Sequence, residues 1–220
     1  MQNIRIRFSK RGRAKYISHL DLMRAMSRAV RRADLPLWYT EGFNPHPYLS
    51  FALPLPLGQE GLREAMDIRL LEDMPLCAIA RRFEGVLPEG IEILCAAQPW
   101  CGPGEISCAE YHIVMPCENP EAWCAGAQAL LEAGSLKAKK MGKQGRRKVE
   151  KEIALAPLIF KYALRPGEKQ AYLACTLAAG SEANLNPALL CEALGAGMPG
   201  GGAPLITRAR LLRGDANEWE

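Results

Sequence analysis

The order of hydrophobic periods is the feature that most constrains how this chain can fold. Residues 4–10 (IRIRFSK) alternate apolar and basic side chains, as a half-buried strand does. Further periods indicate a helix at 18–33, extended pieces at 37–40 and 49–55, a strand at 64–71, a helix at 74–90 and a strand at 91–98. This β-α-β-β-α-β order is that of a ferredoxin-like domain.

The second half repeats the pattern after a segment at 99–108 that is broken by proline and glycine. Strand periods lie at 109–116, 158–166, 170–179 and 203–212, and helical periods at 119–134 and 186–195. Asn119 and Pro120 are typical of a helix start, and Gly134 of its end. We therefore predict an α+β fold of tandem ferredoxin-like (βαββαβ) domains at 1–99 and 107–213, followed by a polar tail. Residues 153–160 fit helix or strand.

Positive charge is concentrated in two zones. Residues 1–32 hold ten Lys or Arg and a single acid, and residues 137–151 hold eight Lys or Arg and a single acid. Such zones suit a polyanion, or else they are a solvated face and a basic hairpin or loop. In the second zone the candidate RNA-binding side chains are Lys139, Lys140, Lys143, Arg146 and Arg147.

The remaining composition points to a cytoplasmic protein without a cofactor. The N-terminus is charged and strand-like, and no apolar run approaches the ~20 residues of a membrane span. The eight cysteines show no CxxC spacing, so we predict no metal site, although Cys101, Cys108, Cys117 and Cys124 lie fairly close together. Cys95, Cys175 and Cys191 lie in apolar stretches and are predicted to be core residues.

The predicted helix at 18–33 has two different faces. Ser18 lies three residues before Asp21, which is typical of a capping box. Leu22, Met26, Ala29 and Ala33 recur at helical spacing and form an apolar stripe. Arg24, Arg28, Arg31 and Arg32 fall on the other side, where they either bind phosphates or form a solvated face.

Two of the three histidines flank this helix. His19 lies at the helix start, where backbone amides should lower its pKa and keep the imidazole neutral. His46 lies in TEGFNPHP, which Gly42, Pro45 and Pro47 make a stiff loop. Tyr39, Phe43, Asn44 and His46 are binding candidates there, although a structural turn with packed aromatic side chains is the alternative. We expect His19 and His46 to line one pocket with Asp21 and Asn44.

The stretches RFSKRGRAKYISHLDLMRAMSRAVRRADLP and GFNPHPYLSFALPLPLG resemble the radical-SAM-linked protein family, a bacterial domain of unknown function. The matching residues include Ser18, His19, Asp21, Gly42, Asn44, Pro45, His46 and Pro47. The resemblance is specific over the first half and loose over the second. It implies a radical-SAM enzyme as partner, while the absence of a CxxxCxxC motif indicates that this chain is not itself that enzyme.

These observations leave three functions open. The chain could be an accessory RNA-binding module that presents tRNA or rRNA to a radical-SAM partner for modification or processing. It could be a metal-independent endoribonuclease that uses His19 and His46 as acid and base, by analogy with ferredoxin-like RNA-processing endonucleases. It could also be a pure protein-interaction domain for the radical-SAM partner. The sequence does not decide whether the protein is an enzyme.

Overall fold

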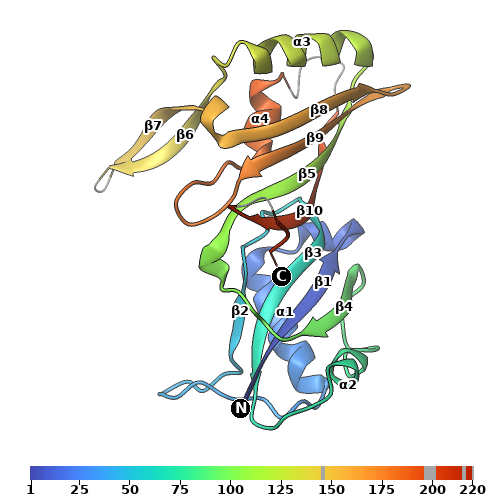
Figure 1. Cartoon of the computed structure of the whole chain (residues 1–220), viewed down its shortest axis with the longest axis vertical. Helices are drawn as coiled ribbons and strands as arrows, with labels where there is room; N and C mark the ends of the chain where they lie inside the picture. The colour runs from blue at the N-terminus through green and yellow to red at the C-terminus, as the bar shows by residue number, and fades with distance from the viewer. Residues whose placement is uncertain (145–146, 196–201, 215–216, 220) are drawn as a thin grey trace. The chain divides into compact units, whose positions relative to one another are not determined.

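The computed structural model describes residues 1–144, 147–195, 202–214 and 217–219, with side chains described up to 139 and again from 152. It divides into two units, residues 1–106 with 208–220, and residues 107–207. Both contain helices and strands, so the α+β class is confirmed (Figure 1). Among the described residues there are four α-helices.

Unit 1 follows the predicted order of elements. It contains β1 (Gln2–Lys10), α1 (His19–Arg32), β2 (Leu49–Phe51), β3 (Glu60–Leu70), α2 (Leu76–Arg81) and β4 (Ile91–Ala97). The strands lie in the order β4-β1-β3, with β2 on the far side of β3. Every pairing among these four strands is antiparallel.

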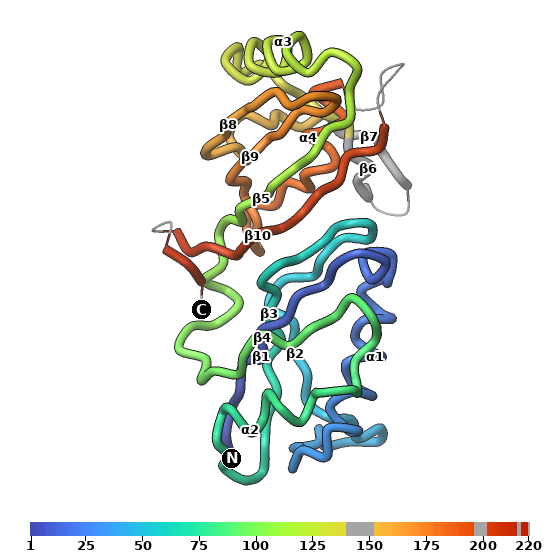
Figure 2. Tube along the Cα trace, turned by 90° about the vertical axis from the view of Figure 1, so that its right-hand side faces the viewer, coloured from blue at the N-terminus to red at the C-terminus, as the bar shows by residue number. Residues whose placement is uncertain are grey.

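The core of unit 1 lies between the sheet and its helices. Alternate residues of β1, namely Ile4, Ile6 and Phe8, are fully buried with the apolar stripe of α1. Figure 2 shows α1 running alongside the strands. Burial of apolar side chains at period 2 in the strand and about 3.6 in the helix is what fixes this packing.

The helix predicted at 74–90 is shorter than expected. α2 ends at Arg81, and residues 83–90 form turns in which Gly85 and Gly90 have φ of +75° and +82°. The backbone at these two positions is left-handed, which glycine adopts without strain and which a helix cannot continue through. The apolar residues of this segment therefore pack from turns onto β4.

Unit 2 contains β5 (Ile106–Pro116), α3 (Pro120–Glu132), β6 (Lys137–Gln144), β7 (Arg147–Ala154), β8 (Ile159–Pro166), β9 (Gln170–Ala178) and α4 (Pro187–Ala193). β9 pairs antiparallel with both β5 and β8. The basic segment is a hairpin, since β6 and β7 form a separate two-stranded sheet. As predicted, Asn119 caps α3 by accepting a hydrogen bond from the Ala122 N–H, and Gly134 follows the helix with φ +62°.

The last strand and the C-terminus differ from the sequence-based division. β10 (Leu205–Arg213) is divided between the units, and residues 208–220 belong to unit 1 rather than to a second domain ending at 213. The end is not a free polar tail, because Trp219 is 3% exposed. Backbone hydrogen bonds from Trp219 N to Leu211 O and from Arg213 N to Asn217 O fold it back on β10.

The predicted linker also packs on unit 1. Arg5 donates to the carbonyl oxygen of Cys101 at 2.8 Å, and Trp219 donates to that of Gly102 at 2.8 Å.

Cys175 and Cys191 are buried as predicted, whereas Cys95 is exposed. The reason is a register shift in the β1–β4 pairing next to Cys95, on a strand at the edge of the sheet.

Candidate nucleic-acid interface

The start of α1 is a side-chain cap. Ser18 Oγ accepts from the Asp21 N–H at 3.2 Å, as predicted, and donates to Asp21 Oδ2 at 2.7 Å. Arg24 Nη1 donates to the other carboxylate oxygen at 3.1 Å. Hydrogen bonds from Ser18 and then from Arg24 lower the pKa of the Asp21 carboxyl. These contacts account for Ser18 and Asp21 through helix capping alone.

The two predicted faces of α1 are present. Leu22, Met26, Ala29 and Ala33 are buried, and all four arginines, Arg24, Arg28, Arg31 and Arg32, are exposed. Arg24 pairs with Asp21, while Arg28 and Arg32 form no ion pair with any described residue. A row of exposed guanidinium groups with so few acids around it raises the local positive potential.

Residues 38–48, which we call the aromatic hairpin, form a closed loop after α1. Thr40 N donates to His46 O at 2.9 Å, and Tyr48 N donates to Trp38 O at 3.1 Å. The turn between them contains Gly42 with φ +125°, a backbone angle that favours glycine. Phe43, beside Gly42, is fully exposed to solvent. The stiff loop predicted from glycine and proline is thus also held by its own backbone hydrogen bonds.

Contacts with two arginines anchor the aromatic hairpin. Arg69 of β3 lies 4.9 Å from the ring centres of both Trp38 and Tyr48, whose own centroids are 6.1 Å apart. Arg31 of α1 lies over the ring of Tyr39 at 5.9 Å. Arginine above an aromatic face is a favourable cation–π arrangement. The second contact brings the arginine row and the hairpin together on one surface.

His46 lies within the hairpin and is exposed. Its Nδ1 is 3.0 Å from the carbonyl oxygen of Asn44 and 3.1 Å from Thr40 Oγ1. Because a carbonyl only accepts, the Asn44 contact favours a proton on Nδ1 and leaves Nε2 with its lone pair. Nε2 is then able to accept a hydrogen bond from a ligand.

His19 has a different set of neighbours. Its ring packs edge-on against Phe51 of β2 with centroids 5.3 Å apart, and its Nδ1 is buried without a hydrogen-bond partner. Burial, followed by the positive charge of Lys10, lowers the pKa of His19. The direction agrees with the expectation from sequence, but burial rather than the helix amides is the main cause. A shared pocket for His19, His46, Asp21 and Asn44 stays a prediction.

Arg28 and Arg32 also line a small hollow. It has a volume of about 170 Å³, and the turn at Gly85, Val86, Leu87 and Pro88 forms its other wall. Guanidinium groups on the wall of a hollow this small suit a single anionic group such as a phosphate.

The second basic zone is described only in part. Lys139 is exposed, and Lys137 forms a 3.0 Å ion pair with Glu152 of the facing strand. Arg146 lies outside the described residues, as do the side chains of Lys140, Lys143 and Arg147.

Sequence reasoning missed several buried charged groups in unit 1, among them Lys10 and Arg208. Lys10 is fully buried and donates to the carbonyl oxygen of Ile17 at 2.8 Å. Arg208 is 1% exposed and donates to both carboxylate oxygens of Glu64. Lys10 continues the inward alternation of Ile4, Ile6 and Phe8, so strand period alone predicts that it points into the core.

Over residues 3–187 the sequence matches the family described as "Uncharacterized protein conserved in bacteria (DUF2344)". The chain belongs to this family. The matched region of this DUF2344 protein includes α1 and the aromatic hairpin. A comparison with curated proteins found no match.

Among solved structures, the DUF2344 chain is similar to one from the crystal structure of a Cbf5-Nop10-Gar1 complex. The TM-score is 0.51 at 10% identity, over 94% of this chain and 48% of the other, so the present chain spans about half the length of its neighbour. At this identity the likeness concerns the fold alone. Within the described part of the chain, no helix is long and apolar enough to cross a membrane.

Proposed function

We propose that this protein is an RNA-binding module that uses α1 and the aromatic hairpin as one interface. The observation that carries the proposal is the contact of Arg31 with Tyr39, which joins exposed arginines to exposed aromatic rings. Phosphate groups would meet Arg28, Arg31 and Arg32, since guanidinium binds phosphate oxygens in pairs.

The aromatic hairpin favours unpaired nucleotides over a regular duplex. Phe43 is fully exposed, and Tyr39 is 42% exposed although Arg31 lies over its ring. Bases of single-stranded RNA stack on such rings, whereas bases inside an A-form helix are inaccessible to them. His46 and Asn44, on the same hairpin, would supply hydrogen bonds to base edges.

Two further proposals concern the architecture and the partner. Both units are ferredoxin-like, a proposal supported by the strand order β4-β1-β3-β2 in unit 1 and by β5-β9-β8 in unit 2, with β6–β7 as an insertion. From the resemblance of the SHLD and GFNPHP stretches to radical-SAM-linked proteins, we propose that the module works with a radical-SAM enzyme in RNA modification or processing. Calorimetric titration with such a purified enzyme tests the partner.

The RNA-binding proposal is tested by fluorescence anisotropy with a labelled 12-nucleotide RNA of mixed sequence, at several salt concentrations. Arg28→Ala with Arg31→Ala should weaken binding and reduce the slope of log K against log salt by about 0.7 for each lost phosphate contact. Phe43→Ala should weaken binding at least about fivefold at every salt concentration, because stacking contributes about 1–3 kcal/mol per base.

The matched control removes two exposed cations from unit 2, by Lys161→Ala with Lys169→Ala. Equal losses in the control and in the α1 variant would overturn the proposal, because they would indicate attraction to net charge alone. Incubation of the RNA without metal provides the second check. Cleavage that requires both His19 and His46 would replace the binding-module proposal with the endoribonuclease.

A further inference from the structure

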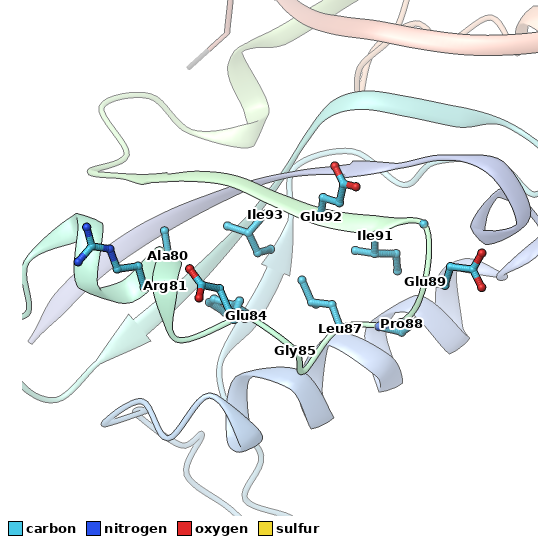
Figure 3. Close-up of a pocket in the computed structure, with 12 residues that line it drawn as sticks. Ala80, Arg81, Glu84, Gly85, Leu87, Pro88, Glu89, Ile91, Glu92 and Ile93 are labelled. Carbon is cyan, nitrogen blue, oxygen red and sulfur yellow. The ribbon is translucent and has the colours of Figure 1, made fainter.

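A groove on unit 1 lies between the turns that follow α2 and the edge strand β4. Its volume is about 550 Å³, which is in the range of ligand pockets. Figure 3 shows Leu87 reaching from the turns toward Ile91 and Ile93 of β4. The groove exists because α2 stops at Arg81, so that turns rather than a helix cover this end of the core.

The groove combines an apolar floor with an acidic rim. Phe83, Leu87, Ile91 and Ile93 form the floor, and Leu87 and Ile93 remain partly exposed. Glu84 and Glu89 lie beside the floor, whereas Glu92 extends from the opposite face of β4 (Figure 3), and all three are exposed. None of the three carboxylates forms an ion pair with a described residue.

The charges around the groove contrast with the rest of the molecule. Three carboxylates and a single cation, Arg81, line the groove, whereas the whole chain has a net charge of +4. An adjoining hollow of about 420 Å³ shares Glu89 and Glu92 and also contains Arg11 and Arg13, yet no ion pair joins these arginines to the two carboxylates in the described part of the chain. The three carboxylates attract a positively charged partner.

We propose that this groove docks a short segment of another protein in which an apolar side chain is flanked by lysine or arginine. The apolar side chain rests on Leu87 and Ile93 and removes their exposed surface from water. The flanking cations pair with Glu84 and Glu89 beside the floor, and a cation that reaches past the edge strand pairs with Glu92 on its other face. The acidic rim gives specificity for the charge of the segment, and the apolar floor requires that the segment also carry an anchor.

The probe for this proposal is the synthetic peptide Lys-Ile-Lys-Leu-Lys-Ile-Lys, added to the full-length ¹⁵N-labelled protein. Amide shifts should be confined to residues 80–93. Replacement of the three carboxylates by Glu84→Gln, Glu89→Gln and Glu92→Gln should lower the affinity for the peptide about tenfold, since each exposed ion pair contributes only modestly. The matched control, Glu118→Gln with Glu121→Gln and Glu168→Gln, removes three exposed carboxylates from unit 2 and should have little effect.

Three results would overturn the docking proposal. One is that the amide shifts caused by the peptide map elsewhere on the protein. Another is that the control triple variant weakens peptide binding as much as the groove triple variant does. The third is equal binding of Lys-Ser-Lys-Ser-Lys-Ser-Lys, which lacks an anchor. RNA affinity should be undiminished in the groove triple, and peptide affinity should be unchanged by Arg28→Ala with Arg31→Ala, so the docking and RNA-binding proposals fail or hold separately.

Discussion

Trp219 holds the C-terminal segment on unit 1, and its truncation to alanine should be strongly destabilising. Its ring lies 3.8 Å from Arg5 Cζ, and its Nε1–H donates to the carbonyl oxygen of Gly102 at 2.8 Å. Arg5 in turn donates two hydrogen bonds to Asp67, at 2.8 and 3.0 Å. The indole therefore covers a buried ion pair and connects the C-terminus, β1, β3 and the segment after β4.

The expected loss follows from these contacts. A buried cation–π contact contributes about 2 kcal/mol and a hydrogen bond about 1 kcal/mol, and the apolar ring contributes the rest. Trp→Ala in a core costs about 3–5 kcal/mol in total. For a chain of this size, 1 kcal/mol shifts Tm by about 2–4 °C, so Trp219→Ala should lower Tm by about 10 °C.

The assay is thermal and urea unfolding followed by circular dichroism, which does not depend on tryptophan fluorescence. Trp100→Ala is the matched control, because Trp100 also lies near an arginine, Arg213 at 4.8 Å, but is 58% exposed. Its loss should cost less than about 1 kcal/mol, as for exposed cation–π contacts. Trp219→Phe keeps a ring without the N–H donor and should fall between. Equal Tm values for Trp219→Ala and Trp100→Ala would refute the assignment of a structural role to the C-terminus.

Three more outcomes are expected. Because burial lowers the pKa of His19, the unfolded chain binds a proton below about pH 6.5 that the folded protein resists. The free energy of unfolding should therefore decrease as the pH is lowered below about 6.5, and His19→Gln should make this decrease smaller. An unchanged pH dependence of the variant in urea unfolding at pH 5–7.5 argues against burial of His19. Burial raises the pKa of Cys175 and Cys191 to about 12, so a thiol reagent at pH 8 should modify exposed Cys95 far sooner, as mass spectrometry of peptides checks. Limited digestion with subtilisin, a protease of broad specificity, should cut first within 139–151, a two-stranded hairpin of marginal stability, whereas a first cut at 99–107 would contradict the packing of that segment.

The sequence by itself determined most of the local structure. Period 2 in β1 and the 3.6-residue period in α1 place Ile6 and Met26 in the core, because only one face of each element is apolar. The caps at Ser18 and Asn119 are equally local, since the side chain bonds to a backbone amide three residues away.

Only the tertiary structure decided which distant residues meet. Arg31 lies on Tyr39 because the chain returns after α1 to pair with β3, a contact that no local period encodes. Trp219 is buried against Arg5, which is more than two hundred residues away in sequence. The polar composition of residues 213–220 therefore gave no sign of this burial. The acidic groove depends on how residues 83–90 pack against β4: Gly85 and Pro88 already mark the end of the helix in the sequence, but no local signal tells where the turns that follow will lie.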